Sequence, residues 1–197
     1  MNQERYATAG WLAITSVLLV IPSFLFSVLS EVGNRRFGWL VLVYLVFALL
    51  QSLFSLYAFY RFKQFLNLRC EFRDADPLIV TLICCGAAIT LVGLAAKVSY
   101  TILGLPKAIV LGFALFFVVC AWAMSVVTIF YGLKMLRLGD DLGGLARPYA
   151  YLNIGMGACG ATVLLLPFAM LAGLAGTVVM GIILVKADGA VAIPEYV

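Results

Sequence analysis

Residues 150–185 read AYLNIGMGACGATVLLLPFAMLAGLAGTVVMGIILV, a run of 36 residues without a charged side chain. A membrane-spanning helix needs roughly 20 consecutive apolar residues. Coiled as one helix, the run would be about 54 Å long, whereas the hydrocarbon core of a bilayer is about 30 Å thick. We therefore expect two short helices that turn back between Pro167 and Gly176, because the proline interrupts the backbone hydrogen bonds and glycine allows a tight turn.

Four further apolar blocks precede this run and share its character. They cover residues 9–30, 38–60, 78–96 and 108–133. Over the whole chain 65% of the residues are hydrophobic, 11% are charged and the mean hydropathy is +1.13, whereas a soluble domain carries about 25% charged residues. This composition predicts an all-α integral membrane protein.

The blocks predict one polytopic transmembrane domain over residues 1–197, a bundle without a soluble domain. Its six transmembrane helices are expected at about 9–30, 38–60, 78–96, 108–133, 150–166 and 171–186. The alternative is five spans followed by a buried or interfacial tail. A faint internal repeat favours three tandem helix hairpins, because residues 85–91 resemble residues 159–165, and residues 59–63 resemble residues 130–134, at nearly the same spacing.

Lysine and arginine are distributed unevenly between the two sides that this topology creates. Nine lie at the N-terminus, in the second and fourth connections and near the C-terminus, and four lie on the other side. Because short cytoplasmic connections are enriched in these residues, we expect both termini in the cytoplasm and the protein in a bacterial inner membrane. The net charge of +4 reflects this orientation. It does not indicate nucleic-acid binding, since no basic cluster lies in a soluble segment.

The sequence lacks the groups that most membrane enzymes and ion-coupled transporters use. It has no histidine, and no Asp or Glu lies inside an apolar block, so the commonest proton shuttle and carboxylate-based proton coupling are both missing. Its five cysteines form no CxxC pair and are expected to be packing residues. We predict no enzyme activity, no catalytic residue, no metal ligand and no cofactor.

The charged residues near the block ends fit structural roles. Asp76 precedes Pro77, the arrangement of a helix N-cap followed by the first helical residue. A divalent-cation site at Asp74 and Asp76 is the alternative, which the neighbouring Arg73 disfavours. Lys97 is expected to extend to the membrane interface as an anchor.

The polarity that remains inside the apolar blocks is neutral and falls on single helix faces. The first block carries a serine stripe, formed by Ser16, Ser23, Ser27 and Ser30. The second carries Tyr44, Gln51 and Ser55, and Asn153 lies near the start of the fifth helix. One interpretation is packing between helices through hydroxyl and small side chains. The other is an intramembrane polar cavity lined by Ser23, Gln51, Ser55 and Asn153.

The two helices predicted in the last run are rich in small residues. Gly157 and Ala161, and likewise Ala169 and Gly173, are four residues apart and form small-xxx-small pairs. These faces should either pack closely together or dock on another chain. Besides the lipid bilayer, the expected partners are therefore other copies of the chain or other membrane subunits. The uncharged turn between the helices is expected to stay within the bilayer or under a partner.

Two functions follow from these features, and the sequence selects neither a ligand nor a partner. The small-residue faces and the lack of reactive groups favour a non-catalytic accessory, assembly or scaffold component of a membrane complex. The polar stripes favour a facilitator or transporter of a small neutral or lipid-like molecule. The second function requires a cavity beside Gln51, and a tightly packed bundle there would count against it.

Overall fold

The computed structural model describes residues 5–32, 38–101, 106–138, 142, 144–162 and 165–189, and these residues form helices and short connections without any strand. The elements are α1 (Arg5–Leu18), α2 (Val20–Val32), α3 (Gly38–Arg69), α4 (Asp76–Thr101), α5 (Lys107–Met135), η2 (Leu136–Leu138), α6 (Ala146–Gly160) and α7 (Leu166–Gly189). The all-α fold predicted from the composition is confirmed.

Five helices in the described part of the chain are long and apolar enough to cross a membrane. They are Tyr6–Glu31, which joins α1 and α2, and Trp39–Arg69, Asp76–Tyr100, Leu111–Leu138 and Leu166–Ala187. The sixth rod, α6, has only 15 residues. It is about 22 Å long, which is less than the thickness of the hydrocarbon core.

The first rod is interrupted at Leu19, between α1 and α2. Pro22 has no N–H to offer the carbonyl of Leu18, and its ring crowds that carbonyl. The backbone hydrogen bonds on either side persist, because the Leu19 amide donates to Thr15 at 3.0 Å and the Ser23 amide donates to Leu19 at 3.2 Å. The rod therefore bends without ending.

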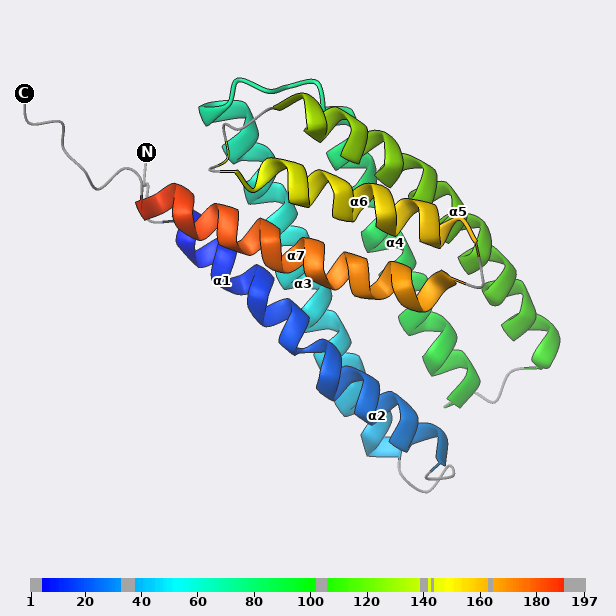
Figure 1. The fold of residues 1–197 in the computed structure, drawn as a ribbon. Helices are drawn as coiled ribbons and strands as arrows, with labels where there is room; N and C mark the ends of the chain where they lie inside the picture. Colours follow the sequence, from blue (N-terminus) through cyan, green and yellow to red (C-terminus); the bar gives the residue numbers. More distant parts are fainter. Residues whose placement is uncertain are drawn as a thin grey trace, which may run out of the picture.

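The helices form a closed ring in which neighbours along the chain are neighbours in space (Figure 1). The rod of α1 and α2 packs on α3, and each later helix packs on the next. The last helix, α7, returns to pack on α1, so the start of α1 and the end of α7 lie at the same end of the bundle. Along the chain the helices therefore form three hairpins: the rod of α1 and α2 with α3, then α4 with α5, and finally α6 with α7.

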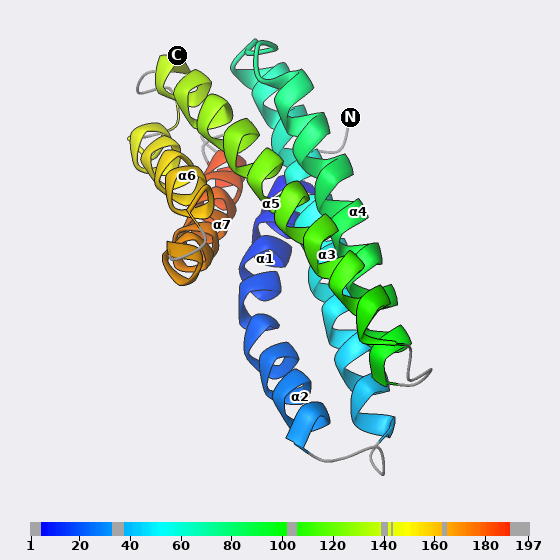
Figure 2. The ribbon, with the colours of Figure 1, turned by 90° about the vertical axis from the view of Figure 1, so that its right-hand side faces the viewer.

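The α6–α7 hairpin crosses the other helices obliquely and covers only part of their length, as Figures 1 and 2 both show. A β-carbon on Gly160, the last residue of α6, would lie 2.5 Å from the Ser125 hydroxyl of α5. From Ser125 back to Lys107, α5 continues for another 18 residues, a length of about 27 Å. The far half of the ring therefore consists of α2, α3, α4 and α5.

The turn of this hairpin differs from the prediction. α6 ends at Gly160 and α7 begins at Leu166, so the turn precedes Pro167 and does not extend to Gly176. Pro167 is in the first turn of α7, where its missing N–H would have no partner in the helix. Gly173 and Gly176 lie within α7 and face α6, because β-carbons there would lie 2.7 Å from Met156 and 3.9 Å from Leu152.

Glycines let two helix pairs, α5 with α6 and α1 with α7, approach closely within the chain. A β-carbon on Gly157 of α6 would lie 2.6 Å from the Ser125 carbonyl oxygen of α5, and one on Gly132 of α5 would lie 2.9 Å from that of Ala150. Gly10 and Gly181 bring α1 and α7 together in the same way. Gly157 of α6 and Gly181 of α7 are thus engaged by neighbouring helices of the same chain, whereas Gly155 has no such neighbour within 4 Å among the described residues.

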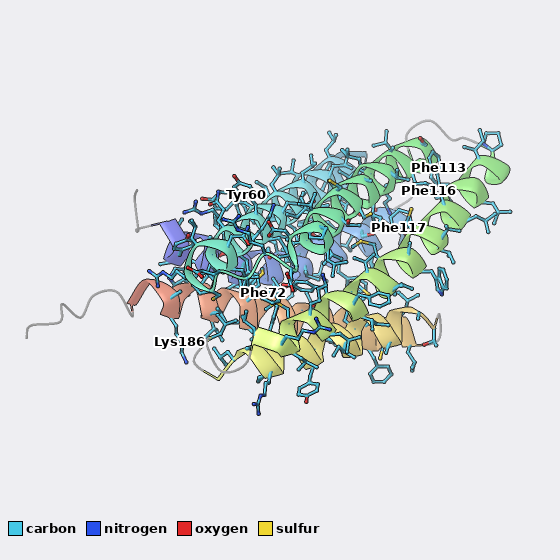
Figure 3. The ribbon with its side chains drawn as sticks, turned by 90° about the horizontal axis from the view of Figure 1, so that it is seen from above. Tyr60, Phe72, Phe113, Phe116, Phe117 and Lys186 are labelled. Carbon is cyan, nitrogen blue, oxygen red and sulfur yellow. The ribbon has the colours of Figure 1, made fainter. Side chains whose placement is uncertain are left out.

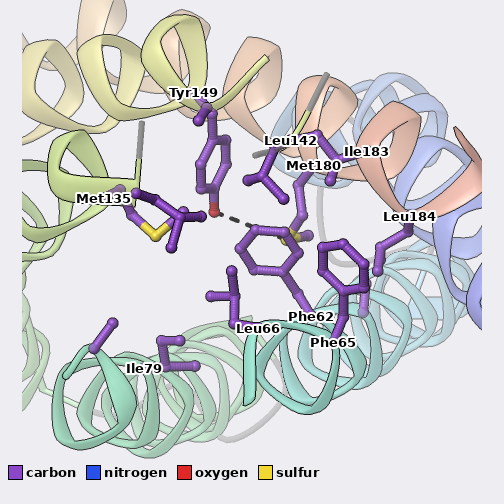
Figure 4. Packing of buried hydrophobic residues seen from close by; sticks show 14 of the residues in the cluster. Phe62, Phe65, Leu66, Ile79, Met135, Leu142, Tyr149, Met180, Ile183 and Leu184 are labelled. Atoms are coloured by element: carbon purple, nitrogen blue, oxygen red, sulfur yellow. Dashed lines mark hydrogen bonds between the residues drawn. The ribbon is translucent and has the colours of Figure 1, made fainter. Parts of the chain in front are cut away.

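A packed core fills the end of the ring that holds the start of α1 and the end of α7 (Figure 4). Phe62, Leu66, Tyr131 and Tyr149 are almost inaccessible to solvent. Around this core, Lys63 forms an ion pair with Asp76 at 3.5 Å, and the Asn67 amide donates to the same carboxylate at 2.8 Å.

The outside of the bundle is covered by large apolar side chains, which project outward around it (Figure 3). Phe24, Leu91 and Val119 are each more than 60% exposed. Water would penalise such a surface and hydrocarbon would not. The exposed apolar surface therefore agrees with five helices that lie in lipid.

Candidate intramembrane ligand site

Gln51 lies near the middle of α3 and lines two neighbouring cavities. It is seven residues after Tyr44 and ten residues before Arg61, distances of about 10 Å and 15 Å along the helix. Its amide makes no hydrogen bond to any described residue. A free amide at mid-span is costly in hydrocarbon unless water or a ligand satisfies it.

The first cavity, the polar groove, is a partly open space of about 330 Å³ between α3 and α4. Its walls are Tyr44, Ala48, Gln51, Ser52, Ser55 and Leu56 of α3, Gly86, Ile89, Thr90, Gly93 and Leu94 of α4, and Phe117 of α5. Two glycines form part of its α4 wall. A β-carbon on Gly93 would lie 3.1 Å from the Phe117 ring, and one on Gly86 would lie 3.8 Å from Leu56.

Neutral hydroxyl groups give this groove its polarity. The Ser52 hydroxyl donates to the Thr90 hydroxyl at 3.1 Å, which in turn donates to the carbonyl oxygen of Gly86 at 2.9 Å. This chain of bonds connects α3 to α4. Ser55, one turn after Gln51, makes no hydrogen bond within the described residues. The groove therefore offers an amide and a hydroxyl to a guest molecule.

Charged residues lie at the end of the groove away from the packed core. The Lys97 ammonium of α4 is 2.9 Å from the Glu31 carboxylate of α2, and 5.6 Å from the centre of the Tyr44 ring. The Lys97 side chain is 13% exposed and that of Glu31 is 66% exposed. Lys97 thus has a partner from another helix, and its charge is already balanced where the groove begins.

The second cavity, the apolar cavity, has a volume of about 370 Å³ and is also partly open. It is enclosed by Val20 of α2, Gln51 of α3, Ala121, Met124, Ser125 and Thr128 of α5, Met156, Gly157 and Gly160 of α6, and Leu166, Ala169, Met170, Gly173 and Leu174 of α7. The two hydroxyls donate to their own helix, Ser125 to Ala121 at 2.8 Å and Thr128 to Met124 at 2.7 Å. Among the residues that line this cavity, Gln51 is the polar side chain that remains to form a hydrogen bond with a guest.

Both cavities end where the packed core begins. Ser55 lines the polar groove, whereas Phe62, two turns further along α3, is fully buried. Thr128 lines the apolar cavity, and Tyr131 in the next turn of α5 is fully buried. The described residues therefore form a pocket that is closed at the end of the ring holding the core.

Two tyrosines strengthen this closed end. The hydroxyls of Tyr131 and Tyr149 are 3.1 Å apart, and Tyr149 also lies 3.9 Å from the sulfur of Met180. Burial raises the pKa of Tyr149 to about 12, so this phenol stays protonated and neutral. Apolar side chains surround the Tyr149 hydroxyl (Figure 4).

The structure brings together two of the four residues predicted to line a cavity. Gln51 and Ser55 both line the polar groove. Asn153 is buried on α6 and donates to the Tyr149 carbonyl oxygen at 2.8 Å, outside both cavities. Ser23 is buried on α2, where its hydroxyl has no hydrogen-bond partner among the described residues, and it lines neither cavity.

Ser52 and Thr90 are site residues that the sequence reasoning missed. Ser52 is adjacent to Gln51 but belongs to a different face of α3, so the periodicity that groups Gln51 with Ser55 does not include it. Gly86, Thr90 and Gly93 have helical spacing on α4, and this small polar face was the signal that could have found the partner of α3.

In the described part of the chain, no three Cys, Asp or Glu side chains come together in a cluster that could hold a metal ion. The five cysteines are all free thiols.

No protein-family model, curated protein or solved structure matches this chain.

Proposed function

We propose that this protein is a multi-pass bacterial inner-membrane protein that binds a small neutral molecule in the polar groove and assists its passage to or from the bilayer. The observation that carries the proposal is the Gln51 amide at mid-span, which has no hydrogen-bond partner in the described part of the chain and lies on the shared wall of two cavities. If the protein bound no ligand, this amide would line a cavity without a hydrogen bond to offset the cost of placing it within the membrane.

The lining of the groove supports a neutral guest. Hydroxyl and amide groups there can donate and accept hydrogen bonds, and no ionised side chain is among the lining residues. Burying an ion without a counter-charge is far more costly than burying a hydrogen-bonding neutral group. We do not assign a catalytic step to the site.

The accessory-subunit role that the sequence favoured has less support. It rested on the small-residue faces of the last two helices, and Gly157, Gly173 and Gly181 of those faces pack on α5, α6 and α1 of the same chain. Binding of further subunits would need other surfaces.

The orientation that we propose places both termini in the cytoplasm. The start of α1 and the end of α7 lie at one end of the bundle. The end of α3, which carries Arg61, Lys63 and Arg69, lies there too, because Arg69 donates to the Ala187 carbonyl oxygen of α7 and Arg61 lies 5.0 Å from the centre of the Tyr6 ring of α1. Lysine and arginine favour the cytoplasmic side. A C-terminal fluorescent-protein fusion should be bright and a C-terminal alkaline phosphatase fusion inactive; the opposite result would reverse the orientation.

The ligand proposal is tested by purifying the full chain in a mild detergent and measuring bound small molecules by native mass spectrometry. We compare the wild type with Gln51→Leu and with Thr90→Val, whose hydroxyl lies in the groove. Thr81→Val is the matched control, because Thr81 is exposed on the same helix and also donates to its own backbone, at 2.8 Å to Pro77.

We expect the wild type and Thr81→Val to retain the same neutral molecule. Thr90→Val and Gln51→Leu should retain about threefold to tenfold less, the effect of losing a hydrogen bond worth roughly 0.5–1.5 kcal/mol. Equal retention in all four proteins, or no bound molecule in the wild type, would overturn the proposal.

A further inference from the structure

We infer that the guest is an amphiphile with one hydrocarbon chain, whose neutral head lies in the polar groove and whose chain lies in the apolar cavity. This inference rests on the proposed function and adds the substrate class. The geometry behind it is the junction of two unlike cavities at a single side chain, Gln51.

The two cavities differ in chemistry in the way that the two parts of an amphiphile differ. The polar groove presents Gln51, Ser55 and the Ser52–Thr90 hydroxyl pair. The apolar cavity presents three methionines, Met124, Met156 and Met170, whose flexible thioether side chains adapt to guests of varied shape. A wholly polar guest would leave the apolar cavity empty, and a wholly apolar guest would leave Gln51 unpaired.

The apolar cavity is accessible from the side of the bundle. Met170 and Leu166 line it and are 61% and 40% exposed on the outer surface. They lie in the first turns of α7, next to the part of the ring that the short α6–α7 hairpin leaves uncovered. In a bilayer this opening would face hydrocarbon, so a chain can enter from the membrane without crossing water.

The size of the cavity favours one chain. Its volume of about 370 Å³ is near the lower end of the roughly 300–1,000 Å³ typical of ligand pockets.

A charged head group is disfavoured in the polar groove, because the Lys97 ammonium at the mouth of this groove is already paired with Glu31 at 2.9 Å.

The test uses a monoacylglycerol with a photoreactive diazirine in its 16-carbon chain, added to the full chain in phosphatidylcholine vesicles. Cross-linked peptides are identified by mass spectrometry. Ala121→Phe fills the apolar cavity, whereas Ala123→Phe, two residues along α5, points to the exposed side and is the matched control. Thermal unfolding and size-exclusion chromatography show whether both variants are folded.

We expect labelling of the wild type on the cavity walls of α5, α6 and α7, with unlabelled monoacylglycerol competing for it. Ala121→Phe should lower this labelling at least fivefold, and Ala123→Phe should leave it unchanged. Wild-type labels confined to outward-facing residues would overturn the inference even if Ala121→Phe did not fold, as would equal labelling of the two alanine variants.

Failure of this inference is distinguishable from failure of the proposed function. If Gln51→Leu loses its co-purified molecule while the cavity walls stay unlabelled, the groove binds a guest that has no hydrocarbon chain. If Gln51→Leu and Thr90→Val keep the molecule, the proposed function itself is wrong.

Discussion

Gly10 of α1 and Gly181 of α7 face each other at the contact that closes the ring of helices. A β-carbon on Gly10 would lie 2.5 Å from the Gly181 carbonyl oxygen, and one on Gly181 would lie 2.8 Å from the Gly10 carbonyl oxygen. Both distances are far shorter than a van der Waals contact. The backbones of α1 and α7 therefore meet directly at these two glycines.

Gly181→Ala should separate α1 from α7 and destabilise the protein. Overpacking of a tight contact costs typically 1–3 kcal/mol, and we expect a fall in the thermal unfolding midpoint measured in detergent. The matched control is Gly112→Ala on α5, where a β-carbon would have no atom within 4 Å. A midpoint for Gly181→Ala equal to that of the control would contradict the close approach.

The Glu31–Lys97 pair should show measurable but modest coupling. The carboxylate is well exposed, which limits the interaction to about 0.5–1 kcal/mol. A double-mutant cycle with Glu31→Gln and Lys97→Met, measured by thermal unfolding, should give a coupling of this size that decreases with added salt. Additive effects of the two substitutions would show that the pair does not hold α2 to α4.

The buried hydroxyl pair predicts a clear contrast between two tyrosines of α6. Tyr149→Phe leaves the Tyr131 hydroxyl buried without its partner, which costs roughly 1–3 kcal/mol. Tyr151→Phe should have almost no effect, because Tyr151 is 62% exposed. The free energy of unfolding of both variants provides the measurement, and equal values would disprove the buried pair.

The empty protein should become more stable when Gln51 is replaced by leucine. The substitution removes an amide that has no partner among the described residues and replaces it with an apolar side chain of similar size. We expect a higher unfolding midpoint for Gln51→Leu than for the wild type after exhaustive washing. A lower midpoint would mean that the amide contributes to packing and that its role is structural.

The helices, and the presence of a polar side chain at Gln51 within one of them, could be predicted from the sequence because both depend on local patterns. Long apolar runs define helices, and an amide within such a run is conspicuous. The neighbours of each helix could not be predicted in this way. Periodicity places Asn153 on a polar face, but only the packing of α6 against α5 and α7 shows that its amide donates to Tyr149.

The position of the last turn depends on tertiary contacts as well. Pro167 and Gly176 are both compatible with a turn, but Pro167 is equally compatible with the first turn of α7 and Gly176 with its interior, which are the positions that they occupy. With the turn at its observed position, Gly173 lies close to Met156 and Gly160 lies close to Ser125. Local turn chemistry therefore identified the hairpin, and helix packing determined where it reverses.

The short reach of the α6–α7 hairpin gives the molecule the shape of a wedge. At the end with the start of α1, six rods cross a given plane, whereas at the opposite end α2, α3, α4 and α5 remain. Each helix with its side chains is about 10 Å across, so the two lipid leaflets are displaced by unequal areas. Such a wedge fits best where the bilayer is convex on its wide side, and it should concentrate in small, highly curved vesicles when its wide end faces outward.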